Sequence, residues 1–383
     1  MSSIFTTAVH AGRVLPAKPG TPSAPAIVTA SSWSQADAPA LDAALGDERA
    51  GYVYSRYGGP TQEALEAAAA ALEQGAGAAV YGSGMAALHA ALLGAGAKPG
   101  AVVVAASELY GATTSLLNFL SANAGVTVRR VDVRDLAAVE AALAGARVLL
   151  FEVISNPLCR VADAPALIGL ARAAGARVIV DSTFTSPYLI QPLTLGADFV
   201  VHSATKYLGG HGDVLGGVVV VAAAEDAAAL RETRKVLGAN LSPFDAYLVL
   251  RGLRTLALRV REQNATALKL AEWLAGDRRV ARVYYPGLPA DPDHAVAARI
   301  FRAGGAGGVL AFDVRAGGRA AVFRFLERLR LVVPAPTLGD ITTLALYPAI
   351  ASHRALTPEQ RAALGIGEGC VRVSAGLEDP ADL

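Results

Sequence analysis

The stretch that decides the fold reads Asp198-Phe199-Val200-Val201-His202-Ser203-Ala204-Thr205-Lys206-Tyr207-Leu208-Gly209-Gly210-His211-Gly212-Asp213. A short apolar strand leads into small polar residues, then a lysine, then glycines. Lysine occurs at only five positions among 34 basic residues, so the chain uses arginine as its ordinary surface cation. Arginine keeps its proton, whereas a desolvated lysine can lose it, and a neutral amine can form a Schiff base. Lys206 is therefore a candidate catalytic amine; the alternative is an ordinary lysine at a strand-to-loop junction.

Near-continuous runs of valine, isoleucine and leucine on both sides of this stretch predict strands. They lie at 78–81, 102–105, 126–131, 148–153, 178–180, 199–201 and 218–221. Helical segments alternate with them, at 61–73, 85–93, 113–122, 136–143, 165–173 and 223–237. Apolar runs without polar alternation are typical of strands that are buried on both faces. The pattern therefore predicts an α/β fold, with a mostly parallel sheet and helices on both faces.

Polar side chains cluster just after the predicted strands, although each is also typical of a cap or turn. They are Ser83 with Gly84, Tyr110, Asn156, Asp181 with Thr183, and the segment from Ser203 to Lys206. In open parallel sheets, ligands bind beyond the carboxyl ends of the strands, so these residues predict one site. The turn Gly82-Ser83-Gly84 precedes a helix, and the free N–H groups of a helix N-terminus attract anions. The alternative is a glycine turn that binds nothing.

The pattern changes after about residue 240 and predicts a smaller α+β domain. A long helical stretch at 243–274, with a break near Gly252, precedes strands at 280–285 and 309–314, a helix at 319–329, and strands at 330–334 and 370–374. We expect an N-terminal arm at 1–55, a cofactor-binding domain at 56–240 and a C-terminal domain at 241–383. Prolines at 16, 19, 22, 25 and 39 predict an irregular arm that wraps a second subunit; the alternative is a loose tail.

Composition excludes several classes of protein. A net charge of +1 without a basic run argues against nucleic acid as a partner. No apolar stretch reaches the roughly 18 residues that span a bilayer, and the N-terminus does not resemble a signal peptide, so we expect a cytoplasmic protein without membrane contact. Cys159 and Cys370 match no disulfide framework or zinc spacing. His202, His211 and Asp213 lack a third histidine or cysteine nearby, so no metal site is expected.

These parts fit one cofactor, pyridoxal 5′-phosphate (PLP). This cofactor needs a lysine for its aldehyde, an acid at its pyridine nitrogen, a phosphate cradle and a group that stacks on its ring. The candidates are Lys206, Asp181, the turn at 82–85 and Tyr110. Tyr54 and Arg56, two residues apart, share a face of an extended segment and suit a phosphate or carboxylate. The alternative for that segment is a tyrosine-rich surface hairpin.

The chain resembles the cystathionine γ-synthase/γ-lyase family, the trans-sulfuration PLP enzymes of cysteine and methionine metabolism. The resemblance covers nearly the whole sequence and rests on ordered matches. They are Tyr54-Ser55-Arg56-Tyr57-Gly58-Gly59-Pro60-Thr61, Gly82-Ser83-Gly84-Met85-Ala86-Ala87, Leu109-Tyr110-Gly111, Ser155-Asn156-Pro157, Val180-Asp181-Ser182-Thr183-Phe184, His202 to His211, Ser242 to Tyr247, Arg251-Gly252-Leu253, Tyr285 to Leu288 and Val371 to Asp379.

The resemblance implies the type I fold of PLP-dependent transferases and a set of residue roles. Lys206, Tyr110 and Asp181 would be catalytic. Arg372 would hold the substrate α-carboxylate, with Asn156 and Thr337 nearby as further substrate-binding residues. The cofactor would contact Tyr54 and Arg56 of a neighbouring subunit and Ser83, Gly84, Met85, Tyr110, Asn156, Asp181, Thr183, Ser203, Thr205 and Lys206. The family also implies a homotetramer built from two dimers.

The resemblance further implies γ-elimination or γ-replacement on sulfur-containing or O-acylated amino acids. A cystathionine γ-lyase or γ-synthase is the first expectation, and an O-acylhomoserine sulfhydrylase or methionine γ-lyase is the alternative. Thr342 stands where many members carry a glutamate, Thr337 replaces a usual serine, and Ala112 stands where methionine γ-lyases have cysteine. These departures leave the leaving group open. Transamination or β-lysis, and an inactive protein on the same scaffold, are further alternatives.

Overall fold

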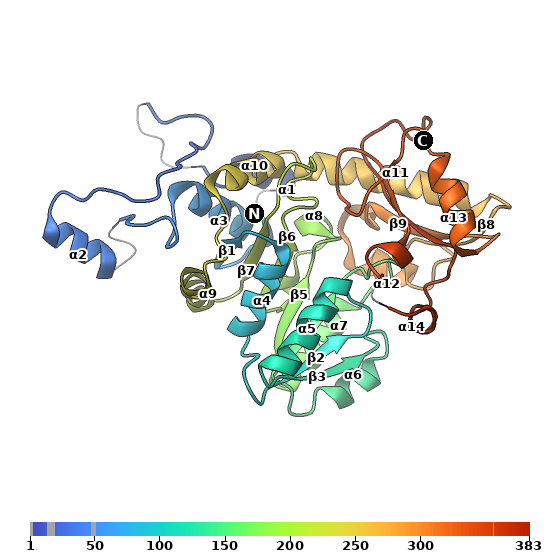
Figure 1. Ribbon diagram of the computed structural model, residues 1–383, viewed down its shortest axis with the longest axis horizontal. Helices are drawn as coiled ribbons and strands as arrows, with labels where there is room; N and C mark the ends of the chain where they lie inside the picture. The colour runs from blue at the N-terminus through green and yellow to red at the C-terminus, as the bar shows by residue number, and fades with distance from the viewer. Residues whose placement is uncertain (1–2, 14–19, 47–50, 355) are drawn as a thin grey trace.

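The computed structural model describes residues 3–13, 20–46, 51–354 and 356–383. Within these residues, the strands form a seven-stranded sheet and a five-stranded sheet. Figure 1 shows the two sheets side by side, with the long helix α11 (Leu256–Ala275) running across the molecule toward the second sheet. The α/β fold class and the smaller α+β part expected from the sequence are therefore confirmed. The domain limits at 55/56 and 240/241 stay a prediction.

The first sheet has the strand order β1-β7-β6-β5-β4-β2-β3. Every residue of β4 and β7 is buried, which requires cover on both faces of the sheet. The strands are β1 (Gly77–Tyr81), β2 (Val102–Ala106), β3 (Thr127–Val131), β4 (Val148–Glu152), β5 (Arg177–Asp181), β6 (Phe199–Ser203) and β7 (Gly217–Val221).

Parallel pairing joins β3, β2, β4, β5 and β6, as predicted from the apolar runs. The exception in this mostly parallel sheet is β7, which is antiparallel to both β6 and β1. The chain between β6 and β7, residues 204–216, contains no helix. Parallel neighbours need a long crossover, so this connection returns the chain beside β6 in the opposite direction.

The helices that alternate with these strands match the predicted segments to within two residues at each end. Polar side chains begin several of them: Ser83 accepts from the backbone N–H of Ala86, and Asp135 accepts from that of Ala138. The helices are α3 (Pro60–Glu73), α4 (Gly84–Gly94), α5 (Gly111–Asn123), α6 (Leu136–Ala142), α7 (Ala164–Ala173), the short α8 (Ser186–Leu189) and α9 (Ala224–Leu237).

The second sheet has the order β10-β11-β12-β9-β8 and carries helices from the C-terminal part of the chain. The predicted break near Gly252 is confirmed, because α10 ends at Leu253 and α11 begins at Leu256. The elements are α10 (Pro243–Leu253), α11, β8 (Val280–Tyr284), α12 (His294–Ile300), β9 (Val309–Val314), α13 (Gly318–Glu327), β10 (Val333–Pro334), β11 (Leu344–Leu346), α14 (Pro358–Ala363) and β12 (Cys370–Ser374).

Four short elements after the N-terminal segment, α8, α12, α14 and β11, were not predicted, and the strand expected at 330–334 is reduced to the two residues of β10. Elements of three to seven residues are shorter than the window in which periodicity can be recognised. The glycine run at 304–308 leads into β9. No described helix has the length and apolar character to cross a membrane.

The N-terminal segment is less irregular than predicted. It contains α1 (Ile4–His10), whose first turn is capped by Ser3, and α2 (Ala38–Gly46), where Pro39 occupies the first turn and so removes no helical hydrogen bond. The expectations for Pro16 and Pro19 lie outside the described residues. Figure 1 shows α2 standing apart from both sheets.

Candidate active site

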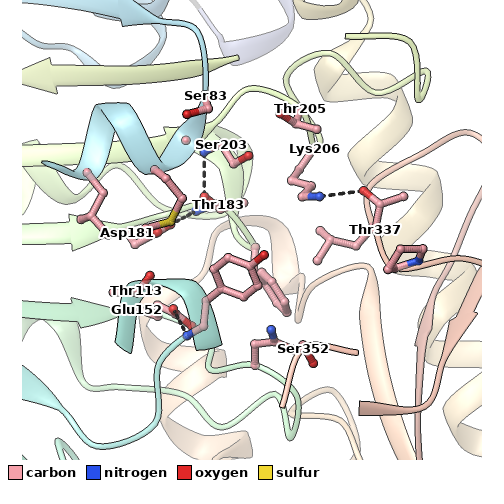
Figure 2. Close-up of a pocket in the computed structure, with 18 of the residues that line it drawn as sticks. Ser83, Thr113, Glu152, Asp181, Thr183, Ser203, Thr205, Lys206, Thr337 and Ser352 are labelled. Atoms are coloured by element: carbon pink, nitrogen blue, oxygen red, sulfur yellow. Dashed lines mark hydrogen bonds between the residues drawn. The ribbon is translucent and has the colours of Figure 1, made fainter. Parts of the chain in front are cut away.

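A cavity of about 400 Å³ lies at the carboxyl ends of β1, β2, β4, β5 and β6, as the polar residues after these strands predicted. Segments before and within the second sheet close its other side, and Figure 2 shows Thr337 facing Lys206 across it. Most of the predicted site residues line this one cavity. They are Ser83, Gly84, Met85, Tyr110, Asn156, Asp181, Thr183, Ser203, Thr205, Lys206, Thr337 and Arg372.

Lys206 is held by its contacts on the far side of the cavity. Its Nζ donates a hydrogen bond of 2.7 Å to Oγ1 of Thr337. Burial, together with the positive charge of Arg372, lowers the pKa of Lys206 to about 8. The backbone after it is also fixed, because Arg259 donates to the carbonyl oxygen of Tyr207 at 2.9 Å. Lys206 is therefore a positioned amine that loses its proton more readily than a surface lysine.

Asp181 and Glu152 are a pair of buried carboxyl groups at the ends of adjacent strands. They are direct neighbours in the register of β5 and β4, and the N–H of Thr183 donates to Oδ1 of Asp181 at 3.0 Å. Burial raises the pKa of Asp181, and burial followed by the charge of Asp181 raises that of Glu152 well above its usual value. Within the described part of the chain, neither carboxyl group has an ion pair with lysine or arginine. The site therefore favours a ligand with a positive charge at this position.

Glu152 was missed in the sequence analysis, although a signal for it existed. It is an acidic residue at the end of a buried apolar strand, which is the same feature that identified Asp181. Its Oε1 accepts from the backbone N–H of Tyr110 at 2.7 Å (Figure 2). Tyr110 also lines the cavity, and 44% of this residue is exposed.

The N-terminus of α4 faces the same cavity and forms an anion cradle. Ser83 caps the helix through a hydrogen bond of 3.1 Å from the N–H of Ala86, which leaves the N–H groups of Gly84 and Met85 without helical partners. A Cβ at Gly84 would lie 2.9 Å from the Cβ of Ser203, so glycine is required for this close approach. The helix dipole and the free N–H groups suit a phosphate. The hydroxyl groups of Ser203 and Thr205 border the same space.

Arg372 supplies a buried positive charge on the opposite wall. Its Nη1 donates to Oδ1 of Asn156 and its Nη2 to the carbonyl oxygen of Thr337, both at 2.9 Å. The residue is 3% exposed, and in the described part of the chain its Nε has no hydrogen-bond partner. Burial lowers its pKa to about 10. No carboxylate in the described chain forms an ion pair with it, so the wall can accept the carboxylate of a ligand.

Tyr54 and Arg56 do not line this cavity. Nη1 of Arg56 donates to the carbonyl oxygen of Lys235 at 2.6 Å, and its guanidinium lies 5.5 Å from the centre of the Tyr54 ring. Tyr54 is 45% exposed and pairs with Ser32 in an isolated antiparallel bridge. Their contact with the phosphate site of a neighbouring subunit stays a prediction. Thr342 and Ala112 also lie outside the lining of the cavity.

Comparisons with known proteins agree with this geometry. The family described as Cys/Met metabolism PLP-dependent enzyme matches residues 5–383. L-methionine gamma-lyase of Pseudomonas putida is 44% identical over 343 residues, which are 89% of this chain and 85% of that protein. O-succinylhomoserine sulfhydrylase of Pseudomonas aeruginosa is 42% identical over 359 residues, 94% of this chain and 88% of that protein. The structure of cystathionine gamma synthase from Xanthomonas oryzae pv. oryzae in complex with cystathionine has a TM-score of 0.93 and 40% identity, covering 100% of this chain and 96% of that chain.

Proposed function

Because this chain belongs to the Cys/Met metabolism PLP-dependent enzyme family, we propose that its cavity performs γ-elimination or γ-replacement on a four-carbon amino acid whose α-carboxylate binds Arg372. The family itself carries out PLP-dependent γ-elimination and γ-replacement, and this chain is a PLP-dependent C–S lyase or transferase. One observation carries the assignment of the substrate site. Arg372 is buried without a carboxylate partner among the residues that the structure describes, and both Arg372 and the amine of Lys206 donate hydrogen bonds to Thr337.

The residues that line the cavity fit the cofactor. The unpaired carboxyl group of Asp181 would hold the proton of the pyridine nitrogen, and the cradle of Gly84 and Met85 with Ser203 and Thr205 would hold the phosphate. Tyr110 would cover one face of the ring. When bound, the cofactor supplies an electron-withdrawing ring that stabilises negative charge at the substrate Cα.

The protein's own groups would then orient the substrate and move protons. The fork of Arg372, oriented by Asn156, binds the α-carboxylate and so fixes which bond at Cα faces Lys206. Lys206, with its pKa lowered to about 8, would accept the Cα proton, pass it on, and then accept a Cβ proton, whose loss allows the bond between Cγ and the leaving group to break. The hydroxyl of Thr337 keeps the amine directed into the cavity between these transfers.

The remaining lining of the cavity indicates which leaving group the site can accommodate. Apart from Lys206, Arg372, Asp181 and Glu152, its lining from this protomer is uncharged, and it includes Phe184, Leu215, Pro336, Leu338, Ala351 and Ser352. Such a surface suits a small uncharged substituent at Cγ, as in methionine or O-acetylhomoserine, better than the charged distal end of cystathionine. We therefore propose methionine γ-lyase or O-acylhomoserine sulfhydrylase activity beside the cystathionine reactions.

Two measurements test this proposal. First, borohydride should abolish a visible absorbance band of the purified protein, and the Lys206→Ala variant should lack that band; a colourless parent protein would refute the cofactor assignment. Second, methionine, cystathionine, O-acetylhomoserine and O-succinylhomoserine are compared with and without a thiol acceptor. Release of 2-oxobutyrate indicates γ-elimination, whereas pyruvate from cystathionine would indicate β-lysis instead.

The homotetramer and its cytoplasmic location are also proposals. Support for a shared site comes from Tyr54 and Arg56, which lie outside the cavity of their own chain. We propose that they complete the phosphate site of a partner. Mixing equal amounts of Arg56→Ala and Lys206→Ala subunits should then restore about one quarter of the parent activity. About half of the dimers formed at random are mixed, and one of the two sites in each mixed dimer regains both residues. Light scattering gives the oligomeric state independently, and a mixture that stays inactive would contradict the shared site.

A further inference from the structure

Two loops behind the cavity carry residues that the reaction depends on. The first loop, residues 107–110, follows β2 and ends with Tyr110. The second loop, residues 153–161, follows β4 and contains Asn156, which accepts a hydrogen bond from the guanidinium of Arg372. Tyr110 is 44% exposed, so packing within this chain does not by itself fix the position of its side chain. The placement of both residues therefore depends on what holds the two loops together.

A glutamate at or in each loop forms a hydrogen bond to the other loop. Glu152, the last residue of β4, lies directly before the second loop and accepts from the backbone N–H of Tyr110 at 2.7 Å. The nearby N–H of Asn156 also favours its charged form. Glu152 lines both the active-site cavity and a second cavity of about 360 Å³ behind it, so it forms part of the wall between them.

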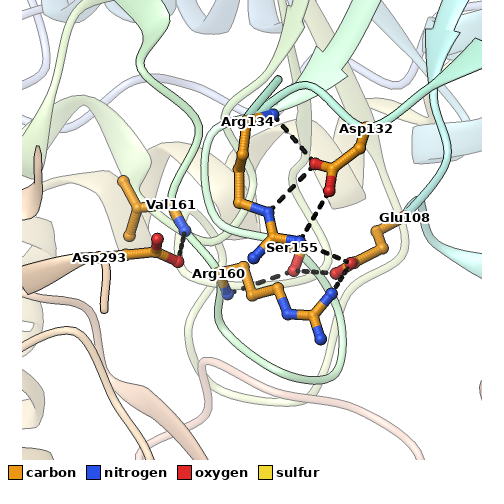
Figure 3. Close-up of polar contacts among 7 residues, drawn as sticks. All are labelled: Glu108, Asp132, Arg134, Ser155, Arg160, Val161 and Asp293. Carbon is orange, nitrogen blue, oxygen red and sulfur yellow. Dashed lines mark hydrogen bonds and ion pairs between the residues drawn. The ribbon is translucent and has the colours of Figure 1, made fainter. Parts of the chain in front are cut away.

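Glu108, in the first loop, makes the opposite connection. Its Oε2 accepts from the hydroxyl of Ser155 at 3.1 Å, and its Oε1 forms an ion pair with Nη1 of Arg160 (Figure 3). The N–H of Arg160 donates back to Oγ of Ser155 at 3.2 Å. The side chains of Glu108 and Arg160 are 18% and 24% exposed, so the pair is partly shielded from water. Ser155 directly precedes Asn156, so this contact reaches the residue that orients Arg372.

We propose that Glu108 and Glu152, with Ser155 and Arg160, form a reciprocal clamp that sets the position of Tyr110 relative to Asn156 and Arg372. These four residues are positioning residues. Glu152 acts on Tyr110 through its backbone, and the Glu108–Arg160 pair acts on Asn156 through its loop. This inference rests on the roles proposed above for Tyr110 and Asn156.

A neighbouring ion pair provides a matched control. Asp132 pairs with Arg134 at 2.8 Å in the same second cavity, but its contacts stay within the loop after β3 (Figure 3). Arg134 approaches Glu108 only at 3.9 Å. An Asp132→Asn variant therefore removes a charge of the same kind beside the clamp and reaches the clamp only through the 3.9 Å approach of Arg134 to Glu108.

The first test measures amide hydrogen exchange in the cofactor-free protein, so that it does not depend on catalysis. The N–H of Tyr110 should lose protection in Glu152→Ala and keep it in Glu152→Gln, because the glutamine oxygen still accepts this hydrogen bond. Peptides that contain Asn156 should exchange faster in Glu108→Ala and Arg160→Met, and stay unchanged in Asp132→Asn. Unchanged exchange in the three clamp variants, with the fold intact, would overturn the proposal.

The second test separates positioning from general stability. Since small misplacements of reacting groups can cost up to about 100-fold, we expect Glu152→Ala to lower kcat about 10- to 100-fold with little change in KM. Arg160→Met should mainly raise KM for the amino acid, about tenfold, because it frees the loop that orients the carboxylate site. Glu152→Gln should recover kcat to within about threefold of the parent. Equal losses in Glu152→Gln and Glu152→Ala would contradict a role through the hydrogen bond.

The failure of the clamp and the failure of the proposed function can be told apart. If Tyr110→Phe and Asn156→Ala remain fully active while exchange changes as predicted, the proposed roles of these two residues are wrong and the clamp still exists. If those variants lose activity but Glu108→Ala, Arg160→Met and Glu152→Ala do not, the clamp is wrong and the proposed function stands.

Discussion

Replacing Arg372 with leucine should remove recognition of the substrate carboxylate while leaving the cofactor site intact. The guanidinium is buried, has no carboxylate partner among the described residues and keeps an unbonded Nε. Its other two nitrogens hold Asn156 and the carbonyl oxygen of Thr337. Leucine fills much of the same volume, so the main change is the loss of a buried cation and its donors.

The size of the effect follows from the lost hydrogen bonds. A hydrogen bond to a charged group contributes about 1.5–3 kcal/mol, so a two-bond fork contributes about 3–6 kcal/mol. At about 1.36 kcal/mol per factor of ten, kcat/KM should fall by about two to four orders of magnitude. Arg372→Lys keeps the charge but loses the two-pronged donor geometry. We therefore expect its kcat/KM to lie about halfway between the values of the parent and of Arg372→Leu on a logarithmic scale.

The assay is steady-state kinetics on the best amino acid substrate, together with inhibition by the matching amine that lacks the carboxylate. The inhibition constant of this amine should be similar in the parent and in Arg372→Leu, because it makes no contact that the variant removes. Cofactor affinity and the melting temperature serve as controls. A fall in kcat/KM of less than about fivefold, or an equal loss of affinity for the amine, would refute carboxylate recognition by Arg372.

Three further predictions concern charge and packing. In the cofactor-free protein, the rate of acylation of Lys206, followed by mass spectrometry, should be half-maximal near pH 8. The reason is that the neutral fraction of the amine increases as pH rises through its lowered pKa, and a midpoint near pH 10 would contradict the lowered pKa. Gly84→Ala places a Cβ 2.9 Å from that of Ser203, and since overpacking costs about 1–3 kcal/mol, the cofactor dissociation constant should rise about 5- to 150-fold in a titration; no change would show that the cradle is elsewhere. Arg234→Met leaves the buried carboxylate of Glu66 without its cation and should lower the free energy of unfolding by about 3–5 kcal/mol in urea titrations, whereas a loss under about 1 kcal/mol would contradict a buried pair.

Much of the site could be predicted because strand ends in a parallel sheet meet at one edge. Lys206 and Asp181 each follow a buried apolar strand, and that position alone assigned both to the same edge. Arg372 and Thr337 could be placed only through the resemblance to a family. Arg372 lies in β12 of the second sheet and Thr337 in the loop between its strands β10 and β11, and no local pattern shows which distant segments close a cavity.

Other features depended on contacts that no local pattern contains. The direction of β7 follows from the length and course of its connection, because an apolar run reads the same in either direction. Glu152 was overlooked although it ends a strand, and its importance became visible only through the N–H of Tyr110 and the carboxyl group of Asp181 beside it.

The sequence by itself determined the alternation of strands and helices, the edge of the sheet where the polar residues meet, and the chemical types available there. Hydrophobic periodicity and turn residues are local features, so they can be recognised without knowledge of the fold. Only the tertiary structure decided the surroundings of three groups: the buried guanidinium of Arg372 has no ion-paired carboxylate among the described residues, burial raises the pKa of Asp181, and burial lowers the pKa of Lys206 to about 8. Burial and pairing are properties of segments far apart in the chain, and they convert ordinary polar residues into a site that can bind and react.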